Sequence, residues 1–432
     1  MPPTGPVLTS LSNEILAIIC NDLSAKDLAA VRLTCKEVNP AATTEFATRY
    51  FRDPFVMMSK KSLETLVQIC KHPVFGPQVR KIQLLSARPS GYSLQPLDEK
   101  FTKAVERKDV ARVKKFRSRD RRLVDVIAEQ LEFEVSSSSH ELMKEAFMTL
   151  EQYQKSVTIA VQRLSTPYSP IGLAKAFKDL RDPTHEILDD QDIVSTLDFM
   201  LKAASCTNCV ARKVEISLDA LVHWPRGFLW ECFRESPREH ASLLMLLEDF
   251  HLNFSWHGSR NANYLAADAL GSIVRRIPKI LKSFTLSSDC DVSRLGRLVL
   301  DRSDPFGWYN ALKSISLNKL MLREEQLIGF LRRNQASLKR LELLELTIVG
   351  NWDQTLSWIS RNLTLDWFAL DRGYKVLGHT RVRGYTEGSA AQWYSTRCEF
   401  QGKQEVYRGL DLFVEMQAEE RQVRGTALLA RK

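Results

Sequence analysis

The chain contains 432 residues, of which 44% are hydrophobic and 26% are charged, and its formal net charge at pH 7 is +9. This length is sufficient for two or three domains with substantial cores, and the composition is ordinary for a globular protein. No window approaches the about 18 consecutive apolar residues of a membrane-spanning helix, and the opening MPPTGPVLTS lacks the basic and apolar stretches of a secretory signal. We therefore expect a protein of the cytoplasm, the nucleus or both, with no membrane as partner.

Eight cysteines are scattered without a regular spacing, which favours a reducing compartment and free thiols. Cys206 and Cys209 form a CxxC pair in front of the segment VEISL. No further ligands follow at a spacing that zinc requires, and no βαβ pattern supports a redox motif around the pair. We expect a loop without a metal or cofactor.

The first 55 residues show the pattern of three short helices. Leu11, Ile15 and Ile19 recur at four-residue steps and predict a first amphipathic helix, whose start Ser12 can cap. Ser24 is expected to cap the second helix, with Asp27 as the acidic partner of a capping box. Three helices in about 50 residues form a module with little surface to bury.

Two further features delimit the second and third helices. Leu28, Val31 and Cys35 follow at helical spacing, and Pro40 is expected to end that run. The third amphipathic segment contains Phe46 and ends before Pro54.

The segment Val79–Leu85 alternates apolar and polar residues, as a half-buried strand does. Residues 98–165 are predicted to form a charged helical insertion, in which one helix precedes Ser136–Ser139 and a long helix follows. The apolar stripe expected on that long helix continues at three- and four-residue steps through the following residues: Ala146, Leu150, Tyr153, Val157, Ala160, Val161 and Leu164.

The second half of the chain contains six similar apolar segments. They begin at the following residues: Ala211, His240, Ile280, Ala311, Ser337 and Asn362. Each reads roughly L-x-x-L-x-L followed by a polar turn, and the segment REEQLIGFLRRNQ after the fourth predicts a helix. The last two steps, of 26 and 25 residues, lie within the about 20–29 residues of leucine-rich repeats. Stacked strand–helix units of this kind bury a face that no single unit could bury.

The N-terminal module resembles the F-box in several short motifs. Leu11, Glu14, Ile15 and Leu16 match its opening, followed by Asp27 and Leu28 and then by Cys35 and Lys36, at preserved spacing. Ser12 stands where proline is usual. The combination with irregular repeats resembles the large fungal F-box family, although the motif covers only about 45 residues.

This resemblance implies a non-catalytic substrate receptor of a Skp–cullin–F-box ubiquitin ligase. The F-box would bind a Skp-type adaptor and through it a cullin, and the repeats would bind a protein substrate. The physical pattern agrees, because the module carries more apolar side chains than one thin core can hide, so that some of them should face a partner. The expected adaptor-binding and supporting residues are Leu11, Ile15, Leu16, Ile19, Leu23, Leu28, Leu33 and Cys35.

The expected fold is therefore α/β overall, with a small all-α F-box module followed by an irregular leucine-rich-repeat solenoid and a helical insertion. The expected domains are residues 7–55 for the F-box module, 56–97 for a first repeat or linker, 98–165 for the insertion, 166–375 for the solenoid and 376–432 for a C-terminal cap and flexible tail.

Two alternative functions remain open at this stage. The chain could be an adaptor-bound protein of a non-ligase complex. It could also be a basic, nucleic-acid-associated repeat protein, because Lys100–Arg122 contains eleven basic residues against three acidic ones. That segment has few aromatic residues, so nucleic acid is not the expected partner. No spacing of histidines, serines or glycines predicts a catalytic, metal or phosphate-binding site.

Overall fold

A computed structural model describes the following residues: 11–34, 36–85, 88–89, 107–113, 121–153, 156–162, 171, 188–189, 193–220, 247–256, 281–288, 312–371, 373–376, 391–394, 398–412 and 414–415. Within them lie α-helices and mostly parallel strands, which confirms the predicted α/β class. The chain divides into two compact units, Met1–Ala211 and Arg212–Lys432. Among the helices of the described residues, none has both the length and the apolar character needed to cross a membrane.

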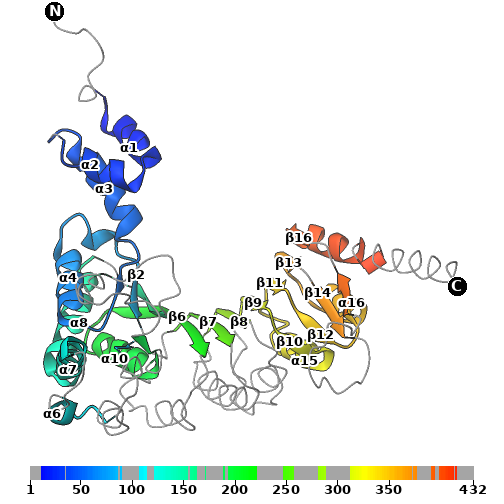
Figure 1. Cartoon of the computed structure of the whole chain (residues 1–432). Coiled ribbons are helices and arrows are strands. Elements are labelled where there is room, and N and C mark those ends of the chain that lie inside the picture. The colour runs from blue at the N-terminus through cyan, green and yellow to red at the C-terminus, as the bar shows by residue number, and fades with distance from the viewer. Residues whose placement is uncertain are drawn as a thin grey trace, which may run out of the picture. The chain divides into compact units, whose positions relative to one another are not determined.

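The first unit opens with the three predicted helices, drawn in blue in Figure 1. They are α1 (Asn13–Asp22), α2 (Ala25–Val31) and α3 (Asn39–Tyr50). Their common core consists of Cys20, Leu28 and Ala42, with the partly buried Leu23, Val31 and Phe46 packed around it. This core is small, as the length of the module requires.

The capping residues of α2 and α3 differ in part from the prediction. The Ser24 hydroxyl accepts the Asp27 amide at 3.2 Å, as predicted, and donates to the Asp27 carboxylate at 2.6 Å. Pro40 does not end a helix. Helix α2 already ends at Val31, and Pro40 lies in the first turn of α3, where a missing amide hydrogen costs nothing.

The rest of the first unit contains a parallel sheet covered by helices (Figure 1). Strands β1 (Phe55–Val56), β2 (Lys81–Leu85) and β4 (Ser156–Gln162) are adjacent in this order and parallel. A short antiparallel pair contains β3 (Arg88–Pro89) and β5 (Leu188–Asp189). The other elements are α4 (Lys60–Lys71), the 3-10 helix η2 (Gly76–Gln78), α6 (Val110–Val113), α7 (Arg121–Val135), α8 (Ser137–Glu151) and α10 (Ile193–Ser205).

The long helix predicted after Ser136 is wrong in its second half. Helix α8 begins within the serine run and ends at Glu151, and the following Val157, Ile159 and Val161 are buried residues of strand β4. A row of β-branched residues is stiff in a helix and packs well in a strand, which explains this outcome. Leu164 lies outside the described residues.

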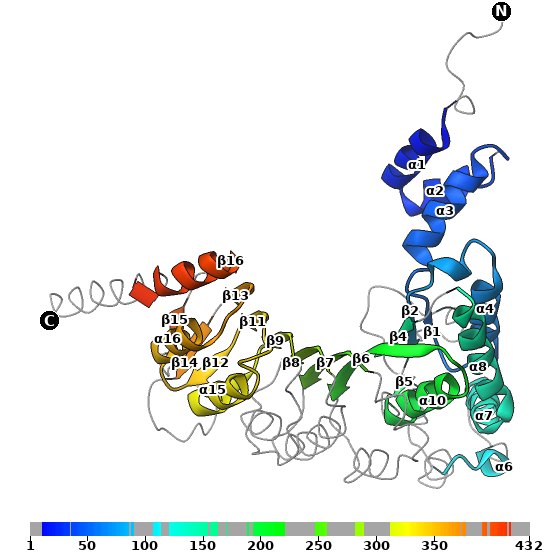
Figure 2. The same ribbon diagram turned by 180° about the vertical axis from the view of Figure 1, so that it is seen from behind.

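Each of the six predicted segments overlaps a strand, and these strands are parallel and adjacent in sequence order (Figure 2). They are β6 (Val210–Ala220, which begins two residues before the second unit), β7 (Asp249–Trp256), β8 (Ser283–Ser288), β9 (Ser314–Asn318), β11 (Arg340–Leu344) and β13 (Trp367–Asp371). Apolar residues are in register across the strands, for example Leu286, Leu317 and Leu343. All three are buried, whereas alternate residues such as Ser316 are half-buried.

Helices and a second sheet follow the later strands. Helix α15 (Glu324–Arg333) coincides with the predicted helix, and α16 (Trp352–Asn362) follows strand β12 (Thr347–Val349). The second sheet contains β10 (Met321–Arg323), β12 (Thr347–Val349), β14 (Gly373–Val376) and β15 (Ala391–Tyr394). At Gly350, with a φ of +151°, an added Cβ would lie 2.6 Å from the Glu324 side chain, which accepts the Asn351 amide. Only glycine fits this turn.

The described C-terminal elements close the sheet of the second unit. Strand β16 (Cys398–Gln401) pairs with β13 in the antiparallel direction, and its Phe400 ring stacks on Phe368 at 6.4 Å. The helix that starts at residue 403 buries Val406 and Leu410. The tail predicted after it lies outside the described residues, and the finer domain boundaries remain predictions.

Replacing Leu317 with alanine should lower the free energy of unfolding by about 2–5 kcal/mol, because this buried side chain contacts the interior from a central strand. Ser316→Ala, one residue away on the half-buried face, should change it by less than about 0.5 kcal/mol. Urea unfolding followed by circular dichroism measures both values. Equal values for the two variants would contradict the assigned orientation of β9.

Candidate partner-binding surface

Helix α1 exposes a row of isoleucines. Ile15, Ile18 and Ile19 are 46%, 65% and 36% exposed. Residues three and four positions apart lie on the same helical face, so the three side chains form one apolar strip. A contiguous apolar strip of this kind is typical of surfaces that bind another protein. We call Ile15, Ile18 and Ile19 the isoleucine strip.

The structure divides the predicted adaptor-binding residues into a core set and a surface set. Leu16 and Leu28 are buried, and Leu23 packs against the core of the module. Ile15 and Ile19 belong to the isoleucine strip, and Leu11 is half-buried just before α1.

Two of the predicted adaptor-binding residues lie beyond α2, and the prediction did not include one residue of the isoleucine strip. Leu33 is 87% exposed in the turn that follows α2, and Cys35 lies outside the described residues. Ile18 is the most exposed residue of the strip, but the sequence prediction omitted it from the site. Its place three residues after Ile15 is the signal that could have found it.

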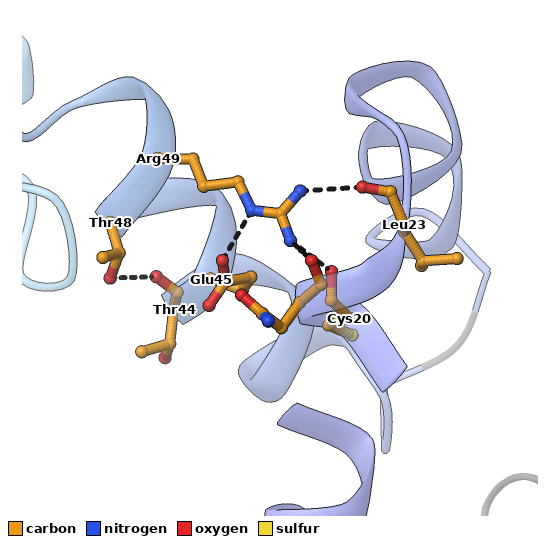
Figure 3. A network of polar contacts seen from close by, with 7 residues as sticks. Cys20, Leu23, Thr44, Glu45, Thr48 and Arg49 are labelled. Carbon is orange, nitrogen blue, oxygen red and sulfur yellow. Dashed lines mark hydrogen bonds and ion pairs between the residues drawn. The ribbon is translucent and has the colours of Figure 1, made fainter. Parts of the chain in front are cut away.

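Arg49 of α3 fixes the carboxyl end of α1 (Figure 3). Its guanidinium group donates to the carbonyl oxygens of Cys20 at 3.0 Å, Leu23 at 2.7 Å and Asn21. The last carbonyls of a helix have no partner within the helix, and here a cation satisfies them. Glu45, one turn earlier on α3, pairs with Arg49 Nε at 2.6 Å and raises the pKa of Arg49. Arg49 therefore positions α1, and with it the isoleucine strip.

The amino end of α1 has a different arrangement from the predicted one. Ser12 occupies the N-cap position with an extended backbone, but its hydroxyl makes no capping bond to a backbone amide. Its hydrogen bond to the Glu14 side chain instead lowers the pKa of that carboxyl group. A carboxylate in the first turn interacts favourably with the helix dipole. Ser12 thus supports the helix start through Glu14.

A cluster of rings joins the end of α2 and helix α3 to the segment after α4. The Arg32 guanidinium lies 4.1 Å from the centre of the Phe46 ring and 5.6 Å from that of Phe75. The Phe75 ring also stacks on Phe51 at 4.4 Å and on His72 at 3.8 Å. Cation–π contacts of this type favour one arrangement of the participating elements.

The cysteine pair lies in the predicted place, between α10 and β6. Cys206 is exposed, whereas Cys209 is buried and desolvation raises its pKa to about 12. Desolvation raises the pKa of the buried Cys70 in α4 to the same value, with a smaller contribution from Cys209. In the part of the chain that the structure describes, no three potential metal ligands lie together.

Most of the basic run Lys100–Arg122 lies outside the described residues. Of the described part, residues 107–113 contain the four-residue helix α6, and Lys108 forms an ion pair with Glu134 of α7 at 3.8 Å. The central basic residues of this run all lie outside the described ranges: Lys114, Lys115, Arg117 and Arg119.

Comparison with known protein families and curated sequences identifies no relative of the chain. No protein-family model matches the chain, and no curated protein sequence matches it significantly. The functional argument therefore rests on the residues and their arrangement.

Arg49→Met should increase hydrogen exchange at the carboxyl end of α1 and lower the thermal unfolding midpoint. Methionine keeps most of the aliphatic length but has no donor for the three carbonyl groups. Mass spectrometry of exchanging peptides measures the effect. Arg52→Met, at an exposed position just after α3, is the control and should change neither quantity. Unchanged exchange in the Arg49 variant would refute the positioning role.

Iodoacetamide at pH 8 should modify Cys206 faster than Cys70 or Cys209 in the folded protein. Cys206 is exposed, whereas a pKa of about 12 leaves almost no thiolate at the two buried positions. Peptide mapping after timed quenching measures the three rates. Guanidinium chloride should make the rates similar, and similar rates without denaturant would contradict the assigned burial.

Proposed function

We propose that the chain is a substrate-recognition subunit of a Skp–cullin–F-box ubiquitin ligase. In this proposal α1–α3 form an F-box module and the strand–helix units of the second unit form leucine-rich repeats. The single observation that carries the proposal is the isoleucine strip on a three-helix module with F-box motifs. The ubiquitin transfer chemistry would belong to other subunits of the complex.

The apolar residues of the module divide into a buried set and an exposed set, which supports the proposal. Cys20, Leu28 and Ala42 hold the three helices together, while the isoleucine strip remains available to a partner. An amphipathic helix with anchors at positions i, i+3 and i+4 fits a hydrophobic groove of another protein. Burying one such side chain contributes about 1.5–3 kcal/mol, so three of them can dominate an interface.

The second unit supports the proposal of a separate binding surface. Its parallel strands carry alternate, half-buried residues in ordered rows across the sheet. Such rows form an extended surface that can be varied one side chain at a time without disturbing the buried rows. One module would then bind a constant adaptor and the other a particular substrate.

The decisive experiment is capture of a fungal Skp-type adaptor by the purified full chain. Ile15→Asp and Ile19→Asp should each weaken adaptor binding by about ten-fold or more, because a carboxylate cannot be desolvated without cost in an apolar groove. Gln68→Asp, at an exposed position of α4, is the matched control and should bind normally. Binding can be measured by calorimetry.

Substitution of the buried Leu16 would be a poor test, because it would disturb the helix itself. Normal adaptor binding by both isoleucine variants would refute the assignment of the strip. Adaptor binding without recruitment of a cullin would instead favour a non-ligase complex. Absence of adaptor binding by the unaltered chain would refute the proposed function.

A further inference from the structure

The strands of the second unit begin with a row of charged residues. Arg212 is the third residue of β6, and the residues directly before the next five strands are Glu248, Lys282, Lys313, Lys339 and Asp366. Backbone hydrogen bonds connect them in this order, for example from the Lys313 amide to the Lys282 carbonyl at 2.7 Å and from the Lys339 amide to the Lys313 carbonyl at 2.8 Å. We call Lys282, Lys313 and Lys339 the lysine row.

Within the described residues, Lys282 is the only member of the lysine row that forms an ion pair. Lys282 pairs with Glu248 at 2.9 Å, and Lys339 contacts the side-chain and main-chain oxygens of Thr364 at 3.4 Å. Lys313 is exposed, and no acidic side chain of the described residues pairs with it. The pKa of the Glu248 carboxyl is lowered, chiefly by its bond to Lys282 and further by the charges of Arg212 and Lys313.

Small hydroxyl side chains lie beside the lysine row on the half-buried face of the sheet. Ser283 and Thr285 of β8 are in register with Ser314 and Ser316 of β9. On the next strand the same two positions hold Arg340 and Glu342, paired at 2.7 Å. The Arg340 guanidinium also lies 3.8 Å from the centre of the Trp367 ring. The hydroxyl groups of these short side chains can donate hydrogen bonds to a ligand.

The basic part of this surface is short and has acidic neighbours on both sides. Glu248 and Asp249 precede it at the start of β7, and Asp366 and Glu399 follow it near β13 and β16. Neighbouring strands lie about 4.8 Å apart, so the three lysines cover about 10 Å. A nucleic acid needs a longer basic track, and its next phosphates would face carboxylates. A peptide with only a few adjacent acidic groups fits this alternation of charge.

We propose that the lysine row and the hydroxyl groups beside it bind a short acidic segment of a protein partner. The anionic groups are carboxylates or phosphates of that segment, placed between Lys313, Lys339 and Arg340 and bonded to the serines of β8 and β9. The bound segment would belong to the substrate of the ligase, and this part of the inference rests on the proposed function. The binding itself does not require the adaptor.

The test is fluorescence anisotropy with the full chain and four labelled probes. The first probe is a peptide with three consecutive glutamates between Gly–Ser flanks, and the second carries phosphoserines in their place. A peptide with lysines in their place and a single-stranded oligonucleotide are the other two. The full chain should bind one or both acidic peptides, with an affinity that falls as salt is added, and should not bind the lysine peptide.

The double variant Lys313→Glu with Lys339→Glu should lose at least about ten-fold in affinity for the acidic peptide. The milder double variant Lys313→Gln with Lys339→Gln should lose less and serves if the first one folds poorly. Arg361→Glu, at an exposed position of α16, is the matched control and should bind normally. Circular dichroism verifies the fold of each variant.

The outcomes separate the possible ligands. Binding of the phosphoserine peptide alone would identify phosphate as the anion, and binding of both peptides would include carboxylates. The proposal is overturned if neither acidic peptide binds, if the lysine variants bind as tightly as the unaltered chain, or if the oligonucleotide binds more tightly at the same lysines.

The Ile15→Asp variant distinguishes failure of this inference from failure of the proposed function. It should bind the acidic peptide normally, because the isoleucine strip belongs to the first unit. Peptide binding by a chain that does not capture the adaptor would refute only the ligase role. Adaptor capture without peptide binding would refute only the acidic-segment site.

Discussion

Each strand of the second unit buries a row of side chains that no single strand–helix unit could remove from water. Leu286, Leu317 and Leu343 illustrate the constraint, because each needs the strand on either side to complete its surroundings. The register of the whole sheet follows from it, since a slip by one residue would turn leucines outward and serines inward. The ordered polar rows on the other face are a consequence of the buried ones, and they provide the surface assigned to an acidic partner.

The N-terminal module is held together by polar contacts in addition to a buried core. Its buried core is formed by few and partly small side chains, and polar contacts supply part of the cohesion. Arg49 bonds three carbonyl oxygens at the end of α1, and Arg32 lies against the Phe46 and Phe75 rings. The Arg49 contacts hold α1 without covering its outer face, so the isoleucines stay exposed while the helix stays in place.

The sequence predicted the features that depend on a local pattern. The alternation around Leu317 and Leu343 was sufficient for the strands, and the spacing around Ile15 for α1. The pattern failed at Val157–Val161, where spacings of three and four residues fit a helix and alternation fits a strand equally. The exposure of Ile18 and the burial of Leu16 depend on where α3 packs, which no local pattern contains. Arg49 was missed for the same reason, since its partners lie more than 25 residues away.

Strand β16 has a consequence for how the sheet could change in length. It runs against the direction of β13, and the described helix after it packs its Gly409 against the Phe400 ring, where an added Cβ would lie 2.3 Å from the ring. A further parallel strand therefore has no free partner beside β13. Duplication of a strand–helix unit could lengthen the array only by insertion among the strands before β13, which would change the width of the recognised surface and leave this terminus intact.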